Sequence, residues 1–328
     1  MASGSHKTVA VTGATGFLGR HAVRALLDAG FHVRGLIRDV RKSERTLGRP
    51  EGLIRIEGDI LDPTSLRELV ASADAVVHTV GIRREIPPKI TFERLHTRAT
   101  ARIVDAARAA GVPRFIQISA LGTRANAPTD YYRTKYDAES IVRRSALDWT
   151  ILRPSIIHGP DGEFVDMVRQ WVLGRAAPRF FLPYFARVEL TPSFPPRPKL
   201  IPAHAQPVHV DDVAKAIVRS LERPESVGEV IPLVGPEPVD WPTMLKTFRD
   251  NMPIGHKHMP AFGIPAPAAV AMARAAKAVG LAGALPFGPG EPVMGSEENT
   301  ANPARARAVL GIEPVAFAQG VRGYADRL

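Results

Sequence analysis

Three side chains in this sequence have the types and spacing that suit proton transfer to a substrate oxygen. Tyr131 and Lys135 stand four residues apart in a segment with helical spacing, so they share one face of the expected helix. Ser119 directly follows the apolar run 115–118, at the carboxyl end of an expected strand, where it could hold the same oxygen. An ammonium group near a phenol lowers the pKa of the phenol and favours proton exchange. The alternative is a solvated helix face with an incidental tyrosine and lysine.

A glycine-rich loop near the amino terminus predicts a cofactor site. The apolar residues 9–11 are followed by glycines spaced three apart, and a helical pattern begins at once. In dinucleotide-binding sheets such glycines allow a tight turn, close approach of the backbone to the pyrophosphate, and close packing of helix on strand. The phosphates lie at the helix N-terminus, where free N–H groups favour negative charge. The loop residues that we assign to the cofactor are Gly13, Thr15, Gly16, Phe17, Leu18 and Gly19.

The end of the second expected strand, residues 31–37, bears on the choice of nicotinamide cofactor. Arg38 follows this strand directly and would accommodate the 2′-phosphate of NADP. Asp39 is the rival, because an acid there would bond to the ribose 2′-hydroxyl of NAD, or it could simply cap the next helix. We predict NADP(H), with NAD(H) as the alternative. Hydride transfer would accompany the proton shift at Tyr131, while Lys135 would also bond to the nicotinamide ribose.

Four further residues at strand ends are assigned to the adenosine half of the cofactor. Asp59 could accept a hydrogen bond from the adenine amino group, with Ile60 against the ring; a loop cap is an equally good interpretation of Asp59. His78 and Val80 end the fourth expected strand, where the chain would pass the adenosine ribose. We expect His78 to be a packed strand residue rather than an acid or base. The histidines show no pair at metal-ligand spacing, so we predict no metal site.

Strands and helices are expected to alternate along the first half of the chain. Helices are expected after the glycine loop, after Pro63 with Asp62 as cap, and at 90–110 and 131–144; strands are expected at 7–12, 31–37, 53–57, 75–80, 115–118 and 149–152. This alternation predicts an α/β fold with a Rossmann-type doubly wound parallel sheet. We assign residues 1–6 to a disordered terminus or tag remnant, 7–160 to an NADP(H)-binding domain, and 161–328 to a smaller C-terminal α/β substrate or partner region, with 206–235 returning to the sheet.

The rhythm changes beyond residue 154. Residues 178–207 are rich in proline and aromatic side chains, which excludes regular helix or a central strand and predicts a lid, a binding loop or a disordered linker. Residues 211–222 predict a helix capped by Asp211 or Asp212. Further helices are expected at 266–279 and, as two short ones, within 304–328.

Composition and charge exclude several classes of protein. The 328-residue chain has no cysteine, which excludes disulfides and thiolate catalysis. It has no apolar run long enough to span a membrane, and its first residues lack the apolar core of a secretory signal. The net charge of +10 is spread over the chain rather than gathered in one run, so we predict no nucleic-acid binding. We expect a cytoplasmic protein, with peripheral contact to an inner membrane as an alternative.

Taken in order, these motifs resemble the short-chain dehydrogenase/reductase superfamily, in its extended and atypical branches. The matching segments are TGATGFLGRH (12–21), LIRD (36–39), GDILD (58–62), ISALG (118–122), YYRTK (131–135), LRPSIIHGP (152–160) and QPVHVDDVA (206–214). ISALG, its spacing to YYRTK, and residues 285–328 are most similar to the atypical group that contains the NADPH-binding 39 kDa accessory subunit of respiratory complex I. The resemblance implies that Pro154 begins the loop beside the nicotinamide.

The resemblance leaves several functions open. We predict an NADP(H)-dependent oxidoreductase that transfers hydride between NADPH and a small carbonyl or quinone-like substrate. Because the accessory subunits bind NADPH without known turnover, a non-catalytic accessory or assembly subunit of a respiratory or quinone-related complex is the first alternative. A redox sensor that reads NADP(H) and an NAD-dependent sugar-nucleotide epimerase are further alternatives, although Arg38 argues mildly against the epimerase.

Overall fold

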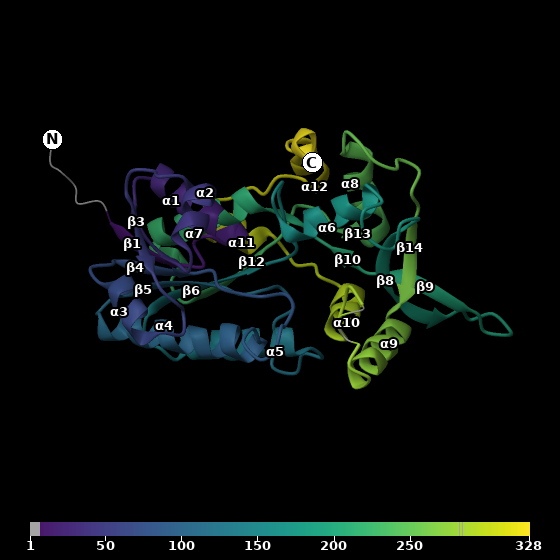
Figure 1. Ribbon diagram of the computed structural model, residues 1–328, viewed down its shortest axis with the longest axis horizontal. Coiled ribbons are helices and arrows are strands. Elements are labelled where there is room, and N and C mark those ends of the chain that lie inside the picture. The colour runs from purple at the N-terminus through teal and green to yellow at the C-terminus, as the bar shows by residue number, and fades with distance from the viewer. Residues whose placement is uncertain (1–6, 282, 284) are drawn as a thin grey trace.

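A parallel sheet of seven strands forms the core of the amino-terminal half (Figure 1). The computed structural model describes residues 7–281, 283 and 285–328, so the prediction for residues 1–6 lies outside the described residues. The strand order is β12-β6-β5-β4-β1-β2-β3, and every neighbouring pair is parallel. This order confirms the predicted Rossmann-type sheet. The strands are β1 (Thr8–Thr12), β2 (His32–Ile37), β3 (Leu53–Glu57), β4 (Ala75–His78), β5 (Arg114–Ile118), β6 (Asp148–Pro154) and β12 (Glu229–Leu233).

Helices cover both faces of this sheet because successive strand residues point to opposite sides. Val9 and Val11 of β1 pack in one hydrophobic cluster with residues of α1 and α7, whereas Ala10 packs in a second cluster on the opposite face. The first face carries α1 (Phe17–Asp28), α7 (Val210–Glu222) and α11 (Ala304–Leu310), with α2 (Val40–Leu47) beside them. The second face carries α3 (Pro63–Val70), the π-helical turn η1 (Glu93–Arg98), α4 (Ala99–Ala109) and α5 (Asp130–Arg143).

Two helix starts test the capping predictions. Asp62 caps α3 as predicted, because its carboxylate accepts hydrogen bonds from the N–H groups of Thr64 and Ser65. The prediction that Asp211 or Asp212 caps α7 is wrong. His209 takes that position, and its ring nitrogen accepts from the N–H of Asp211. The expected single helix over 90–110 is also interrupted, since its first turn is the π-helical segment η1.

The C-terminal half forms a third hydrophobic cluster against a small sheet. Val165, Leu182, Phe248 and Phe317 are among its buried members. The longer elements are α6 (Glu163–Val172), α8 (Trp241–Asn251), α9 (Ala266–Ala278), α10 (Gly290–Ser296), α12 (Phe317–Arg322), β8 (Leu182–Leu190), β9 (Pro198–Pro202) and β14 (Ala261–Pro265). The short elements are the strand pairs β7 (Ile157–His158) with β11 (Val208–His209) and β10 (His204–Ala205) with β13 (Val239–Asp240), and the 3₁₀ turns η2 (Pro224–Ser226) and η4 (Ala325–Arg327).

The expectation that residues 178–207 exclude a central strand is wrong. β8 is the middle strand of the three-stranded sheet β14-β8-β9, parallel to β14 and antiparallel to β9. The prolines lie where a missing N–H disrupts few of the hydrogen bonds between strands. Pro183 is the second residue of β8, and Pro198 and Pro202 are the first and last residues of the edge strand β9. The β8–β9 hairpin projects from the body of the protein (Figure 1).

Candidate functional site

The glycine loop between β1 and α1 has the geometry that close phosphate approach requires. Gly13 has a φ of +72°, and a Cβ there would lie 2.7 Å from the hydroxyl oxygen of Thr79. A Cβ on Gly19 would lie 1.9 Å from the carbonyl oxygen of Gly13, so only glycine lets α1 pack this closely. The helix begins at Phe17, after Gly16. Its first-turn N–H groups have no helical acceptor and are therefore suited to an anion.

The strand ends next to this loop carry the residues assigned to the adenosine half. Arg38 and Asp39 are exposed after β2, and the Asp39 carboxylate accepts from the N–H of Lys42 as the N-cap of α2. Asp59 is exposed, and its carboxylate accepts from the N–H of Leu61, as a loop cap would. Ile60 is buried beside it. The structure therefore leaves Arg38 as the exposed cation at the end of β2, while both acids have backbone partners.

His78, at the end of β4, is a fully buried strand residue. Its Nδ1 lies 2.6 Å from the hydroxyl oxygen of Thr12, and burial, assisted by the nearby Lys135 charge, lowers the pKa of its imidazole to about 3. Val80 packs partly buried against the α3–α4 face. Pro154 ends β6, and its carbonyl accepts from the N–H of Leu121.

Lys135 and Ser119 are both buried at the carboxyl end of β5. Lys135 is 5% exposed, and its Nζ donates to the carbonyl oxygen of Ile118, the residue before Ser119. Burial lowers the pKa of the Lys135 ammonium to about 8, although Glu139 opposes the shift. Ser119 is also buried, with its Oγ 3.3 Å from the hydroxyl of Thr123. A Cβ on Gly81 would lie 3.0 Å from Lys135 Nζ, so the ammonium also borders the loop after β4.

Tyr131 has a different environment from the one that its spacing to Lys135 suggested. Burial raises the pKa of its phenol to about 12, while the charge of Arg83 opposes the shift. The expectation that Lys135 lowers this pKa is therefore wrong for this structure. Among the described residues, the Tyr131 hydroxyl makes no hydrogen bond with Ser119 or Lys135. Its ring instead packs edge-on against other aromatic rings, including Phe92, because α5 faces η1 here.

His96 of η1 is a member of this neighbourhood that the sequence analysis missed. It is buried, and its ring lies edge-on to Tyr131 with centroids 5.4 Å apart. In the sequence, His96 is simply a histidine within an expected helix. Its partners come from α5 and from the loop after β4, which only the fold brings close to it.

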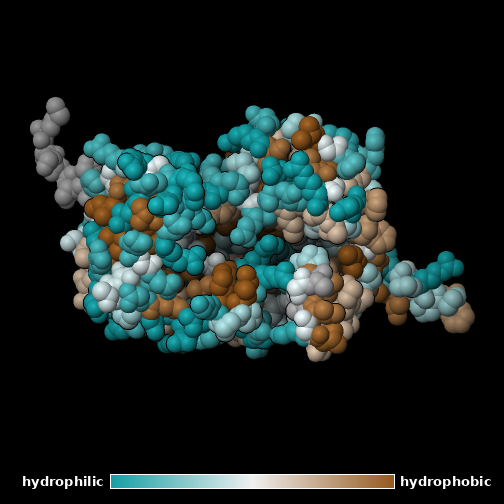
Figure 2. Space-filling model, viewed as in Figure 1, coloured by the Kyte–Doolittle hydropathy of each residue, from teal (hydrophilic) through white to brown (hydrophobic). Residues whose placement is uncertain are grey.

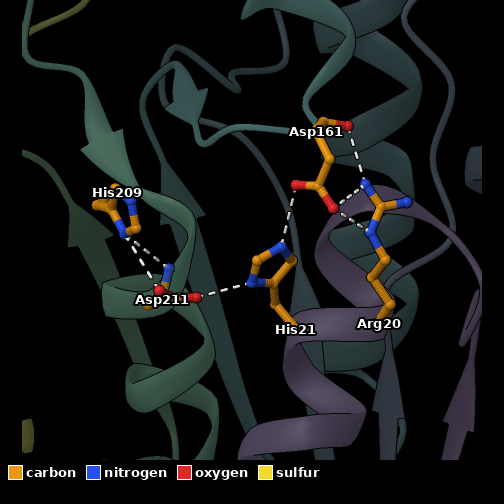
Figure 3. A network of polar contacts seen from close by, with 5 residues as sticks. All are labelled: Arg20, His21, Asp161, His209 and Asp211. Atoms are coloured by element: carbon orange, nitrogen blue, oxygen red, sulfur yellow. Dashed lines mark hydrogen bonds and ion pairs between the residues drawn. The ribbon is translucent and has the colours of Figure 1, made fainter. Parts of the chain in front are cut away.

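A polar network connects α1, the helix that follows the glycine loop, to segments more than 100 residues further along the chain (Figure 3). Arg20 donates to the carboxylate of Asp161, and His21 lies between Asp161, at 3.2 Å, and Asp211, at 2.7 Å. Hydrogen bonding to His21 holds the pKa of Asp211 below its usual range, against the effect of burial. His209 contacts Asp211 from the start of α7. The N-terminal turns of α1 are thus held by the segment after β7 and by α7.

An open hollow of about 520 Å³ lies between the loop after β5 and α10. Its lining includes Arg124, Pro128, Val293 and Glu297, and Arg124 donates to Glu297 at 2.7 Å. Figure 2 shows the surface hollowed between the two halves of the molecule, near α5 and α10. Among residues 7–281, 283 and 285–328, no group of three or more acids and histidines could hold a metal. Over the same residues, no helix has the length and apolar character of a membrane span.

Comparison with known proteins identifies the kind of domain in the amino-terminal half. Residues 13–169 match a family model described as NAD(P)H-binding. This match supports the predicted NAD(P)H-binding domain in the amino-terminal half, whose doubly wound sheet the structure shows.

Two curated relatives carry different names. One is a ceramide reductase of Caulobacter vibrioides, 36% identical over 160 residues that make up 49% of this chain and 49% of the relative. The other is subunit 9 of the NADH dehydrogenase [ubiquinone] 1 alpha subcomplex of Dictyostelium discoideum, 26% identical over 76% of this chain and 67% of the relative. The chain thus spans only about half to two thirds of the length of these relatives.

Solved structures match over nearly the whole chain at low identity. The NADPH-dependent quinone oxidoreductase QOR2 of Escherichia coli, complexed with NADPH, is 16% identical with a TM-score of 0.71, covering 97% of this chain and 100% of that chain. UDP-glucuronic acid 4-epimerase of Bacillus cereus, complexed with NAD, is 19% identical with a TM-score of 0.70, covering 98% and 97%. At such identities the likeness establishes the fold alone. NAD and NADPH both occur in these neighbours.

Proposed function

We propose that this protein is an NADP(H)-dependent oxidoreductase that transfers hydride between the cofactor and a carbonyl or quinone-like substrate. The observation that carries the proposal is the position of Lys135. Its buried ammonium bonds to Ile118 at the end of β5, directly before Ser119 and on the helix that bears Tyr131. A buried cation is costly, and groups with strongly shifted pKa values cluster at functional sites.

In the proposed reaction, NADPH supplies the hydride when bound, and the chain handles the proton. The Tyr131 phenol is protonated near pH 7, as phenols ordinarily are, and this is the form that can donate to a reduced substrate oxygen. The Lys135 ammonium would bond to the nicotinamide ribose and so hold the cofactor beside Tyr131. Ser119 Oγ donates a hydrogen bond to the same substrate oxygen and holds it in place.

NADP(H) is the proposed cofactor because the two side chains after β2, Arg38 and Asp39, differ in their hydrogen bonding. Asp39 already caps α2 through its carboxylate, which leaves it less free to bond to a ribose hydroxyl. Arg38 is exposed and makes no ion pair within the described residues. A guanidinium at this strand end suits a 2′-phosphate. The relative named ceramide reductase supports a reductase as the class of enzyme.

Replacing Tyr131 with phenylalanine tests this proposal. We expect Tyr131→Phe to lower NADPH-dependent turnover of a panel of small ketones, aldehydes and menadione by about 100-fold or more, because the proton donor is lost. The dissociation constant of NADPH, measured by fluorescence titration, should change less than about twofold. Tyr136→Phe, one turn further along α5, is the matched control. Unchanged turnover in Tyr131→Phe would reject the role of this residue.

The second candidate function is a non-catalytic NADPH-binding accessory or assembly subunit of a respiratory complex. Relatives named as NADH dehydrogenase subunits favour it, as does the absence, within the described residues, of a hydrogen bond from Tyr131 to Ser119 or Lys135. This candidate predicts that the protein co-sediments with respiratory membranes and retains NADPH unreacted. A monomer in solution that turns over a small carbonyl compound would reject it.

A further inference from the structure

The backbone changes its helical period at the point where it passes the proposed site. Residues Glu93–Arg98 form a π-helical turn before α4 continues as a regular α-helix. Such turns are rare and occur frequently at functional sites. The hydroxyl of Thr100 donates to the carbonyl oxygen of His96 at 2.6 Å, which supports the backbone of the altered turn. His96, 1% exposed, is the buried residue that this turn presents to α5.

The ring of His96 joins two segments that border the proposed site. Its Nδ1 lies 2.9 Å from the hydroxyl oxygen of Thr134, which stands between Tyr131 and Lys135 on α5. Its Nε2 lies 3.2 Å from both the N–H nitrogen and the carbonyl oxygen of Ile82, in the loop after β4. The imidazole therefore connects the reactive turn of α5 to the loop that borders Lys135.

Counting donors favours Nδ1 as the ring nitrogen that carries the proton. The hydroxyl of Thr134 has one hydrogen, and it donates this hydrogen to the carbonyl of Asp130 at 2.8 Å. With the hydrogen placed there, the oxygen of Thr134 accepts from Nδ1–H of His96, which leaves Nε2 as the acceptor for the N–H of Ile82. The other tautomer would pair Nε2–H with the carbonyl of Ile82, but it would leave the Ile82 N–H unpaired and withdraw the Thr134 hydrogen from Asp130. The Nδ1-protonated form satisfies every donor.

The same ring also contacts Tyr131 and borders the glycine that Lys135 approaches. It stacks on Phe92, with centroids 5.3 Å apart, and lies edge-on to Tyr131 at 84°. A Cβ on Gly81 would lie 3.0 Å from Lys135 Nζ and 3.8 Å from His96 Nε2, so the ammonium and the imidazole both border this glycine. Burial, followed by the charge of Lys135, lowers the pKa of His96 to about 2, which keeps the ring neutral.

We propose that His96 is a positioning residue: as the Nδ1-protonated tautomer it fixes Thr134, and with it the turn of α5 that carries Tyr131 and Lys135, against the Gly81–Ile82 loop. Its catalytic consequence rests on the proposed oxidoreductase function. Its hydrogen-bond arrangement does not, so the two can be tested separately.

The arrangement is tested without turnover by ¹⁵N NMR of the histidine rings in the full chain at pH 7. The His96 signals are assigned by their loss in His96→Gln. We expect a protonated Nδ1 and an unprotonated Nε2 in a neutral ring. A ring that is protonated at Nε2, or charged, would overturn the proposal.

The functional consequence is tested at Thr134, where the perturbation is smaller than at His96. Thr134→Val keeps the volume and removes the hydroxyl, so we expect kcat with NADPH and menadione to fall about tenfold while the KM for NADPH changes less than twofold. Thr134→Ser restores the hydroxyl and should recover most of the activity. Ser140→Ala is the matched control, because Ser140 makes the same kind of bond to the carbonyl four residues earlier on α5.

The outcomes separate this inference from the proposed function. Equal kcat values for Thr134→Val and Ser140→Ala, in folded proteins that bind NADPH, would overturn the positioning role. Absence of NADPH oxidation in the unmodified protein across the carbonyl and quinone panel would instead reject the oxidoreductase proposal, and the NMR result would still decide the His96 arrangement.

Discussion

Lys135 places an ammonium group in the interior of the protein, where a charged group loses its hydration. One hydrogen bond to Ile118 and the neighbouring Glu139 offset only part of that loss. Glu139 is itself fully buried and accepts from Arg153 and Arg143, so its charge is shared with other cations. The lysine therefore costs stability in the folded state, which is the usual condition of a group kept for chemistry.

This cost gives a pH-dependent prediction. The pKa of Lys135 is about 8 in the folded protein, below its ordinary value of 10.5, so the unfolded chain binds more protons between these values. The destabilisation is complete below about pH 8 and fades as the pH rises towards 10.5. We expect Lys135→Met to raise the free energy of unfolding at pH 7 by up to about 3 kcal/mol, and the gain should shrink at pH 10.

Thermal and urea unfolding of both proteins at pH 7 and pH 10 measure this effect. The exposed Lys42→Met serves as the control and should show little change at either pH. A loss of stability in Lys135→Met at pH 7, or an equal gain at both pH values, would contradict the assignment of a costly buried charge.

Arg38 decides the proposed preference for NADP(H). A charge-assisted hydrogen bond to a phosphate contributes about 1.5–3 kcal/mol, so Arg38→Ala should weaken NADPH binding roughly 10- to 100-fold. The affinity for NADH should stay within about twofold, since NADH lacks the 2′-phosphate. Calorimetric titration with both cofactors measures the difference, with Arg41→Ala as the control on the adjacent helix. An equal loss for both cofactors would show that Arg38 acts on the fold rather than on the phosphate.

At the scale of elements, the approach of α1 to β1 depends on Gly19. An added methyl group would lie 1.9 Å from the carbonyl oxygen of Gly13, so α1 must move away from the loop. We expect Gly19→Ala to lower the free energy of unfolding by about 2–3 kcal/mol and to weaken NADPH binding at least tenfold. Urea unfolding and fluorescence titration measure the two effects, and Arg24→Ala, exposed on the same helix, is the control. Normal NADPH affinity in Gly19→Ala would mean that the packing of α1 does not set the phosphate site.

At the scale of the whole molecule, the end of the chain completes the core of the C-terminal half. Tyr324 is buried, and its hydroxyl oxygen lies 2.9 Å from Nδ1 of His158 on β7. His158 is also fully buried, and its Nε2 has no partner among the described residues. Burial raises the pKa of Tyr324 and lowers that of His158 to about 3, so both groups are neutral. Their bond joins the last turn of the chain to the segment that follows the main sheet.

Tyr324→Phe tests how much the hydrogen bond between Tyr324 and His158 contributes to the stability of the protein. The change leaves the imidazole of His158 without its hydrogen-bond partner, which should cost about 1–3 kcal/mol of unfolding free energy in a urea titration. Tyr136→Phe on α5, whose side chain is only partly buried, should cost less. Equal stabilities of the two variants would show that the His158–Tyr324 bond adds nothing to the closure.

The sequence by itself determined the parts of this protein that depend on local pattern. The glycines at 13, 16 and 19, the alternation of apolar runs with helical segments, and the cap at Asp62 each follow from neighbouring residues, and they predicted the main sheet and its first loop. The spacing of Ser119, Tyr131 and Lys135 likewise predicted a candidate site.

Only the tertiary structure decided the surroundings of those residues. The burial that raises the pKa of Tyr131, the contact of His96 with Thr134, the pairing of β8 between β9 and β14, and the cap of α7 by His209 all involve long-range packing, or the choice among neighbouring polar groups that such packing imposes. Periodicity records which face of an element is buried. Periodicity does not predict which distant side chain packs against that face, and this partner determines the desolvation and hydrogen bonding of each reactive group.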